Sequence, residues 1–438
     1  MVRQIPRLAL FPATAEVNTK GHLVIGGCDT ANLIADYGTP LYVFDETGLR
    51  NKCREYKQEF GKRYVKTTVV YASKAFLDKS LVQILKEEGI WLDAVSAGEF
   101  SIGRAAGFPM PHVYFHGNNK SAEELLLALE WGVGHIVVDN FHELVLLSEL
   151  AGKLKTKPDI LLRLTPNIDA HTHRFLSTGV TDSKFGFPLA YGAEAVEKAL
   201  ASPNVNLVGL HCHIGSSIFE VQPYLDAVDN MLKFAAEMKQ KFGFELQQLD
   251  IGGGFALQYV VANPAPPVSV FAEAITSRLT AKCKELKLNQ PELLIEPGRS
   301  VVGQSGVALY SVGAVKEVPG VRTFVCVDGG MSDNIRPAIY DAKYEAVVAN
   351  KVGEKDIKKV TIAGKYCESG DILIRDIELP EIATGDILAI PSCGAYCIPM
   401  ACNYNAALKP AIVMVKDGKA RLIRRRETFE DLVSTDLV

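Results

Sequence analysis

The sequence lacks an apolar run long enough for a membrane-spanning helix, about 18 residues, because Lys, Asp, Glu, Gly or Pro interrupts every candidate. It also lacks an excess of one charge: 47 Lys and Arg oppose 51 Asp and Glu, so nothing suggests a nucleic-acid partner. Pro6 and Pro12 break the short apolar segment near the N-terminus, which makes it a poor signal peptide. We therefore expect a cytoplasmic protein that binds neither nucleic acid nor membrane.

Regularly spaced cysteines are missing as well. The nine cysteines are odd in number and irregularly placed, unlike the disulfide frameworks of small secreted domains, so most should be free thiols. Cys393, Cys397 and Cys402 form a loose group that lacks Cys-x-x-Cys spacing and a nearby histidine. We expect buried, inert cysteines there rather than a zinc site, and we predict no metal.

What the sequence does contain, from Pro40 to Arg299, is an alternation of short apolar runs with stretches of helical periodicity. About eight such units over some 250 residues favour a (β/α)8 barrel, since an open doubly wound sheet usually stops near six strands. The expected strands are 69–71, 91–95, 113–115, 135–138, 160–164, 207–211, 246–251 and 293–295, and the expected helices include 77–88, 122–131, 141–154, 193–200, 224–241 and 271–286.

After Arg299 the helical periodicity ends and a β-rich domain is expected. Strand-like runs cover 307–315, 322–327, 360–363, 386–390 and 411–415, and residues 416–419 read Lys-Asp-Gly-Lys, a hairpin turn. The arginines at 424–426 favour a solvated strand end over a phosphate or nucleic-acid site, because charge is balanced elsewhere. The length of 438 residues agrees with a barrel plus a second domain.

Lys74 follows the first apolar run, where a buried strand should give way to a loop. Barrel enzymes keep their reactive groups at such strand ends. A lysine near low-dielectric walls is easier to deprotonate and can attack an aldehyde to form a Schiff base. Taken alone, Lys74 is better explained as a surface lysine at a helix start, so the catalytic interpretation depends on the rest of the chain.

Other chemically capable residues fall at the expected strand ends and together favour a single site. They are Asp93, Arg163, His211 to Ser216, Gly252 to Gly254, and Glu296 to Arg299. Glycines let backbone N–H groups approach an anion, and the loops after the last barrel strands are a recurrent phosphate site, to which Ser216 and Arg299 can add donors.

A reactive lysine beside a phosphate site suggests pyridoxal 5′-phosphate, which carries an aldehyde, a phosphate and a basic ring nitrogen. Glu296 is then the carboxylate that keeps the ring nitrogen protonated. His213 is the better candidate to lie against the ring face. His211 lies two residues earlier on the same strand face. It either supports the residues that contact the cofactor or only packs in the core.

The ordered set of motifs resembles the fold-type III, alanine racemase-like pyridoxal-phosphate decarboxylases, and within them the diaminopimelate decarboxylases. The motifs are Tyr-Ala-Ser-Lys (71–74), His-Cys-His-Ile-Gly-Ser (211–216), Asp-Ile-Gly-Gly-Gly-Phe (250–255), Glu-Pro-Gly-Arg (296–299), Cys-Glu-Ser-Gly-Asp (367–371) and Gly-Ala-Tyr (394–396). The resemblance implies a barrel over 39–299, a β-domain over 300–438 that residues 1–38 join, and a homodimer that shares its active sites.

The resemblance also implies roles for individual residues. The expected catalytic residues are Lys74, Cys367 as proton donor, and His213. The expected cofactor-binding residues are Lys74, Asp93, His213, Ser216, Gly252, Gly253, Gly254, Glu296, Gly298, Arg299 and Tyr396. The expected substrate-binding residues are Arg299, Arg336, Tyr340, Glu368 and Tyr396. Arg336 and Tyr340 would bind a distal carboxylate and Glu368 a distal amine, the two groups that diaminopimelate carries.

Two departures and several alternatives stay open. Residues 397–400 read Cys-Ile-Pro-Met where relatives often have glycine and small residues, and residues 406–410 lack a common arginine- and proline-rich run. The alternatives are a decarboxylase of another carboxylated diamine such as carboxynorspermidine, a racemase, for which no second acid/base beyond Cys367 is evident, and a non-catalytic cofactor-binding homologue.

Overall fold

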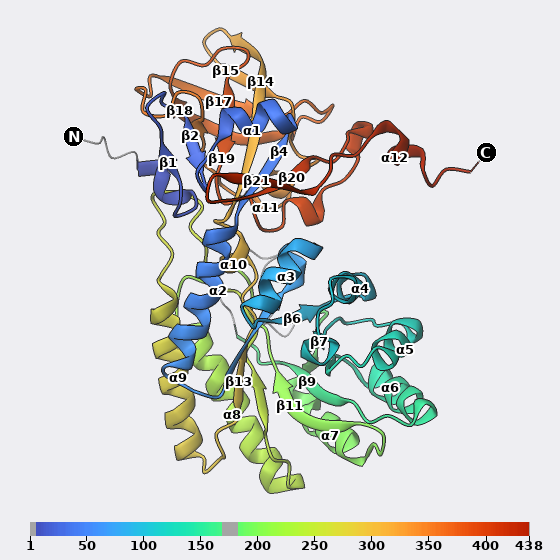
Figure 1. The fold of residues 1–438 in the computed structure, drawn as a ribbon. Coiled ribbons are helices and arrows are strands. Elements are labelled where there is room, and N and C mark those ends of the chain that lie inside the picture. The colour runs from blue at the N-terminus through green and yellow to red at the C-terminus, as the bar shows by residue number, and fades with distance from the viewer. Residues whose placement is uncertain (1–5, 169–182, 438) are drawn as a thin grey trace. The chain divides into compact units, whose positions relative to one another are not determined.

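The computed structural model describes residues 6–168 and 183–437, and the chain divides into two compact units. The barrel unit comprises residues 53–256 and 265–298. The β unit comprises residues 1–52, 257–264 and 299–438. Figure 1 labels their elements. Each unit is described by itself.

Eight parallel strands close the barrel unit, as predicted. They are β5 (Thr67–Ala72), β6 (Trp91–Ala94), β7 (Val113–Phe115), β8 (His135–Val138), β9 (Asp159–Thr165), β11 (Asn206–His211), β12 (Gln248–Asp250) and β13 (Glu292–Ile295). Their order is β9-β11-β12-β13-β5-β6-β7-β8, and β8 pairs with β9 to close the ring. The two-residue strand β10 (Phe187–Pro188) adds to β9.

Helices follow the strands and surround them (Figure 1). They are α3 (Lys79–Glu87), α4 (Ala97–Ala105), α5 (Ala122–Glu130), α6 (Phe141–Leu154), α7 (Leu189–Ala201), α8 (Gln222–Phe242) and α9 (Val268–Glu285). Local sequence fixes several starts: Asp78, Ser96, Ser121 and Asn140 cap α3 to α6 by accepting from a backbone N–H three residues ahead. The periodic stretches therefore became helices close to their predicted bounds.

The barrel interior is filled by side chains. One buried cluster joins Val70, Tyr114, Val137, Leu161, Val208 and Leu294, each from a different strand. Such layers of branched side chains are what a (β/α)8 barrel requires, since its centre is a packed core and no pore. The reactive groups can then gather only at the ends of the strands.

The β unit is built on one nine-stranded sheet and one three-stranded sheet. The large sheet runs β18-β17-β15-β14-β4-β20-β21, with β19 paired to β14 and β16 paired to β19. Its strands are β4 (Leu41–Asp45), β14 (Gly306–Val318), β15 (Arg322–Val327), β16 (Val347–Val348), β17 (Lys358–Ala363), β18 (Ile372–Leu379), β19 (Ile387–Ile390), β20 (Ala411–Lys416) and β21 (Lys419–Arg424). The small sheet is β1 (Glu16–Val17), β2 (Leu23–Ile25) and β3 (Cys28–Asp29).

The start of the barrel differs from the predicted residue 39. Leu41–Asp45 forms β4, which pairs with β14 and β20 of the β unit and is buried along its whole length. An apolar strand followed by helix α2 (Glu46–Gly61) looks like a barrel unit in sequence, yet here its partners come from the C-terminal half. The β unit also contains the short helices α1 (Thr30–Tyr37), α10 (Arg299–Val302), α11 (Arg336–Tyr340) and α12 (Phe429–Val433); the last three follow Arg299, after which we expected none.

The cysteines of the described chain are free thiols, as expected. Cys393 and Cys397 are buried, whereas Cys402 is exposed, so the expectation of a buried group was wrong for Cys402. Among the described helices, none has both the length and the apolar character needed to cross a bilayer.

Candidate active site

The predicted residues of the barrel unit gather at the carboxyl ends of adjacent strands. Lys74 lies in the 3-10 turn Ser73–Ala75 that follows β5, and Asp93 lies within the neighbouring strand β6. Lys74 Nζ donates to Asp93 Oδ2 at 3.1 Å, and the carboxylate is fully buried while the lysine side chain is 41% exposed. The buried carboxylate orients an accessible lysine, which can bind an aldehyde once it has lost its proton.

Glu296 follows β13 and is nearly surrounded by buried polar side chains. Its Oε1 lies 2.8 Å from His116 Nε2, and its Oε2 lies 3.5 Å from His211 Nε2. Burial alone would raise the pKa of Glu296, but the two histidines hold this pKa well below its usual range. Glu296 is therefore an anion at neutral pH, as the partner of a protonated ring nitrogen must be.

Ligating atoms of Asp250, Glu296, His116 and His211 lie within 4.8 Å of one another, a spacing that a metal ion would also tolerate. Burial, and then the charge of Glu296, raise the pKa of Asp250 well above its usual range. Because Glu296 is the predicted partner of the cofactor ring nitrogen, we interpret this cluster as the base of a cofactor site.

The glycine loop, residues Gly252 to Gly254, follows β12. Gly252 and Gly254 have φ of +72° and +93°, and a Cβ on Gly254 would lie 2.3 Å from the Gly215 carbonyl oxygen. Only glycine meets both conditions without strain. The Gly253 N–H donates to His213 Nδ1 at 3.2 Å, which fixes that ring nitrogen as an acceptor.

His213 and Ser216 lie in the loop after β11, next to the glycine loop. Burial, and then the charge of Lys74, lower the pKa of His213 well below its usual value. His213 is consequently a neutral ring, suited to lie against an aromatic cofactor. Gly298 also approaches the Lys74 strand closely: a Cβ there would lie 2.8 Å from Ala72 Cβ.

These groups fit pyridoxal phosphate. Oε1 of Glu296 makes no regular hydrogen bond within the described residues and can accept one from a ring N–H. The positive-φ glycine loop can present backbone N–H groups to a phosphate, and Lys74 can hold an aldehyde. Asp93, His213, Ser216 and Gly298 lie on the same rim, so the barrel unit holds most of the predicted cofactor set. Arg163 lies within β9, and its guanidinium is 4.5 Å from the centre of the Phe185 ring.

The predicted substrate residues belong to the β unit, where two arginines share one tyrosine. Arg299 Nη1 donates to Tyr259 Oη at 2.9 Å, and the Arg336 guanidinium lies 4.7 Å from the centre of the same ring. Arg299 also stacks 4.6 Å from the ring of Tyr396, which carries a φ of +59°. Within this unit the two guanidiniums therefore form one cationic centre.

Arg336 begins α11 and is buried. Its Nη1 donates to Tyr344 Oη, while its Nε has no hydrogen-bond acceptor among the described residues. Arg336 therefore contacts Tyr344 as well as Tyr259, and the predicted Tyr340 lies at the opposite end of α11. A buried guanidinium with an unmet donor is a ready partner for a carboxylate.

Cys367 and Glu368 lie in the loop between β17 and β18, and both are exposed in the chain. Hydrogen bonds to neighbouring residues fix the conformation of this loop. Asp371 accepts from Met331 N at 2.7 Å and from Tyr366 N at 2.9 Å, and Cys367 N donates to Asn405 Oδ1 at 2.9 Å. The thiol is therefore presented to the outside of the single chain.

Sequence reasoning missed four residues of these clusters: His116, Asp250, Tyr259 and Tyr344. Asp250 stood inside a quoted motif as the last residue of β12, and His116 directly follows β7, so a strand-end position was an available signal for both. Tyr259 and Tyr344 are brought to the arginines by tertiary contacts of the β unit, for which the sequence carries no local signal.

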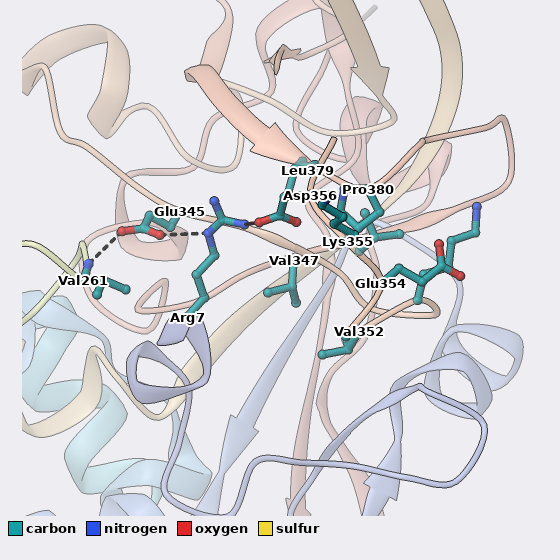
Figure 2. A pocket seen from close by; sticks show the side chains of 13 residues that line it. Arg7, Val261, Glu345, Val347, Val352, Glu354, Lys355, Asp356, Leu379 and Pro380 are labelled. Atoms are coloured by element: carbon teal, nitrogen blue, oxygen red, sulfur yellow. Dashed lines mark hydrogen bonds and ion pairs between the residues drawn. The ribbon is translucent and has the colours of Figure 1, made fainter. Parts of the chain in front are cut away.

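A cavity of about 500 Å³ opens elsewhere on the β unit and is lined by none of the predicted site residues. Figure 2 shows Arg7 between two carboxylates of its lining. Arg7 Nε lies 3.0 Å from Glu345 Oε2, and Arg7 Nη1 lies 2.8 Å from Asp356 Oδ2. Glu345 also accepts from Val261 N at 2.7 Å. Arg7 therefore pairs with both carboxylates and links segments of the β unit that are far apart in the sequence.

Residues 46–303 match the family described as pyridoxal-dependent decarboxylase, pyridoxal binding domain. The diaminopimelate decarboxylase of Bacillus subtilis is 48% identical over 97% of this chain and 97% of its own length. The chain belongs to the diaminopimelate decarboxylase family. The predicted cofactor, pyridoxal phosphate, and the predicted class, carboxy-lyase, are thereby confirmed.

Solved structures of the family agree with this assignment. The diaminopimelate decarboxylase of M. jannaschii, in co-complex with L-lysine, superposes with a TM-score of 0.91 at 36% identity, covering 97% of this chain and 98% of that one. The enzyme from Helicobacter pylori, complexed with L-lysine, gives 0.86 at 32% identity, covering 93% and 98%. The predicted barrel with an added β-domain is the fold of this family.

Proposed function

We propose that this chain removes one carboxyl group from meso-2,6-diaminopimelate as carbon dioxide and releases L-lysine, the last step of lysine biosynthesis. The observation that carries the proposal is the buried Arg336 guanidinium, whose Nε has no acceptor among the described residues. A distal carboxylate on the substrate satisfies it. A substrate without that carboxylate leaves the donor unmet, which costs about 1–3 kcal/mol.

The cofactor, when bound, supplies an electron sink for the electron pair that the departing carbon dioxide leaves behind. The residues of the barrel unit would hold it: Lys74 its aldehyde, the glycine loop its phosphate, and Glu296 its ring nitrogen. Asp93 orients Lys74, whose Nζ lies 3.1 Å from Asp93 Oδ2. The neutral His213 ring adds no charge near the site and accepts from Gly253 N.

The residues of the β unit act on the substrate and on the proton. Arg336 binds the distal carboxylate of the substrate, and Glu368 binds its distal ammonium. Arg299 and Tyr396 contact the end of the substrate that loses carbon dioxide. Tyr340 remains a proposed contact to the carboxylate. The Cys367 Sγ–H donates the proton that replaces the lost carboxyl group. Selection between substrates then depends on an anion and a cation at the distal end.

A homodimer is also proposed, with the Cys367 loop of one protomer completing the Lys74 site of its partner. The support is that residues 367–369 are exposed in the single chain, where a proton donor would be open to bulk water. The test mixes two inactive variants, Lys74→Ala and Cys367→Ala, under conditions that exchange subunits. Shared sites predict recovery of about a quarter of wild-type activity, since half the dimers would regain one of two sites. No recovery despite proven exchange would exclude sharing.

The substrate assignment is tested by carbon dioxide release with added pyridoxal phosphate. The compounds compared are meso-diaminopimelate, L-lysine, L-ornithine and carboxynorspermidine. We expect strong preference for meso-diaminopimelate and a KM raised about 10- to 100-fold in Arg336→Gln, which removes charge-assisted bonds. Arg375→Gln, on β18 and exposed, is the matched control. Turnover of another diamine precursor in place of diaminopimelate would reassign the substrate.

A further inference from the structure

His116 has the shortest contact to Glu296 of the neighbours whose distances define this cluster. Its Nε2 lies 2.8 Å from Glu296 Oε1, compared with 3.8 Å to Asp93 Oδ1 and 3.5 Å between His211 Nε2 and Glu296 Oε2. The residue is 4% exposed, and its own backbone N–H donates to Ala94 O at 2.7 Å. The backbone of His116 is thus held in place, and its Nε2 lies at ion-pair distance from one carboxylate oxygen, without the alignment of a regular hydrogen bond.

His211 lies farther from Glu296 than His116 does, and the charge of Arg163 also acts on Glu296. Burial lowers the pKa of His211 to about 3, so this ring is neutral at working pH. Burial and the Glu296 charge raise the pKa of Asp250 well above its usual range, and Asp250 offers no positive charge in any state. A buried carboxylate needs a compensating donor or cation, because an unpaired buried anion is costly. His116 is placed to provide it.

We propose that His116 carries a proton on Nε2 and holds Glu296 ionised and oriented toward the cofactor ring nitrogen, as a positioning residue of the decarboxylase. The inference rests on the proposed function, since it concerns the cofactor that function uses. Without this proton Glu296 would tend to take one up itself, and a protonated carboxyl cannot stabilise a ring N–H in the same way. The cofactor would then be a weaker electron sink, although no residue that touches it had been replaced.

A merely structural role for His116 is the competing explanation. Its ring makes an edge-to-face contact with His211 at a centroid distance of 4.9 Å, so its removal also disturbs packing. The two amide variants His116→Gln and His116→Asn separate these roles. The glutamine amide nitrogen reaches the place of histidine Nε2, whereas the shorter asparagine amide reaches only the place of Nδ1. Both leave a polar side chain of similar kind.

The experiment reconstitutes the full chain with pyridoxal phosphate labelled with 15N in the ring and records the 15N chemical shift of the bound cofactor. We expect a protonated ring nitrogen in the wild type and in His116→Gln. We expect a shift toward the unprotonated position in His116→Asn, with kcat lowered about tenfold. Glu296→Gln provides the reference for a ring nitrogen without its carboxylate.

His135→Gln is the matched control for disturbing a buried barrel histidine. His135 stacks on Tyr114 at 4.2 Å and approaches Gln248, so it lies in the barrel core and the 15N shift should not move. An unchanged 15N shift in His116→Asn, with activity lost, would make His116 a packing residue and overturn the inference alone. A wild-type chain that binds no labelled cofactor would overturn the proposed function instead.

Discussion

Arg299 donates a hydrogen bond from Nη1 to Tyr259 Oη at 2.9 Å. The same phenol ring lies against the guanidinium of Arg336, so Tyr259 connects an arginine proposed for the reacting end of the substrate with one proposed for its distal end. Tyr259 belongs to a short segment, 257–264, that lies between two barrel segments of the chain yet is part of the β unit. It therefore sets the spacing of two cations, and that spacing should matter for a substrate with two carboxylates.

Tyr259→Phe tests this spacing. The ring contact with Arg336 is kept and the bond to Arg299 is lost. We expect KM for diaminopimelate to rise about tenfold, the value of one hydrogen bond to a charged group, with kcat changed less. Steady-state carbon dioxide release measures both constants. Tyr191→Phe, on the exposed side of α7, should behave as wild type. An equal fall in kcat with KM unchanged would show that Tyr259 acts on chemistry instead.

The barrel could be predicted because its strands are compact apolar runs followed by helical stretches, and a side chain caps four of those helices, α3 to α6. The run at 69–71, for example, became Thr67–Ala72, and Asp78 capped the helix that follows. The glycine loop and Glu296 could be predicted for the same reason: strand ends on one rim are neighbours in space. His116 occupies the same kind of position but stands alone after its strand, outside every motif.

The β unit was harder to predict because its pairings are long-range. Strand β18 reads Ile-Leu-Ile-Arg-Asp-Ile-Glu-Leu, with charged residues inside the run, and it was not predicted. Strand β4 was assigned to the barrel although it pairs with strands some hundreds of residues later. Likewise Tyr344 accepts a hydrogen bond from Arg336, because the chain turns after α11 in a way that no local pattern records.

Gly254→Ala should weaken cofactor binding. The new Cβ would lie 2.3 Å from the Gly215 carbonyl oxygen, and residue 254 has a φ of +93°. The loop must therefore shift, and its N–H groups would no longer point toward the phosphate. Such strain costs about 1–3 kcal/mol, which corresponds to a cofactor Kd raised about 10- to 100-fold. Titration of the cofactor into the chain measures this. Gly61→Ala, where nothing lies within 4 Å of the new Cβ, should bind normally. An unchanged Kd in Gly254→Ala would remove the glycine loop from the phosphate site.

Cys367→Ala should bind the cofactor as wild type does and lose most of its turnover. The side chain is exposed on a loop whose shape depends on Asp371 and Asn405, so removing the thiol leaves the loop intact. The cofactor absorbance checks binding, and lysine formation checks the proton donor. Cys402→Ala, which removes another exposed thiol, should keep full activity. Equal activity in both variants would exclude Cys367 from the mechanism.

Asp333 should make the β unit less stable as pH rises from about 4 to about 7. Tyr310 and Tyr42 donate to its carboxylate, as does Gly330 N at 2.9 Å, yet burial raises the pKa of Asp333 to about 6. A carboxyl group with a raised folded-state pKa favours the folded state fully below its unfolded pKa, and this contribution is lost as pH rises through 6. The loss amounts to about 3 kcal/mol.

Denaturant unfolding of the wild type and Asp333→Asn, from pH 4 to 7, measures that contribution, because the asparagine cannot titrate. We expect the stability difference between the two chains to change by about 3 kcal/mol in favour of the variant as pH rises. Asp417→Asn is the control: Asp417 is exposed in the β20–β21 turn at a φ of +49°, a conformation that asparagine also accepts. A difference that stays constant with pH would mean that Asp333 is ionised in the folded chain throughout, and that its two tyrosine donors outweigh its burial.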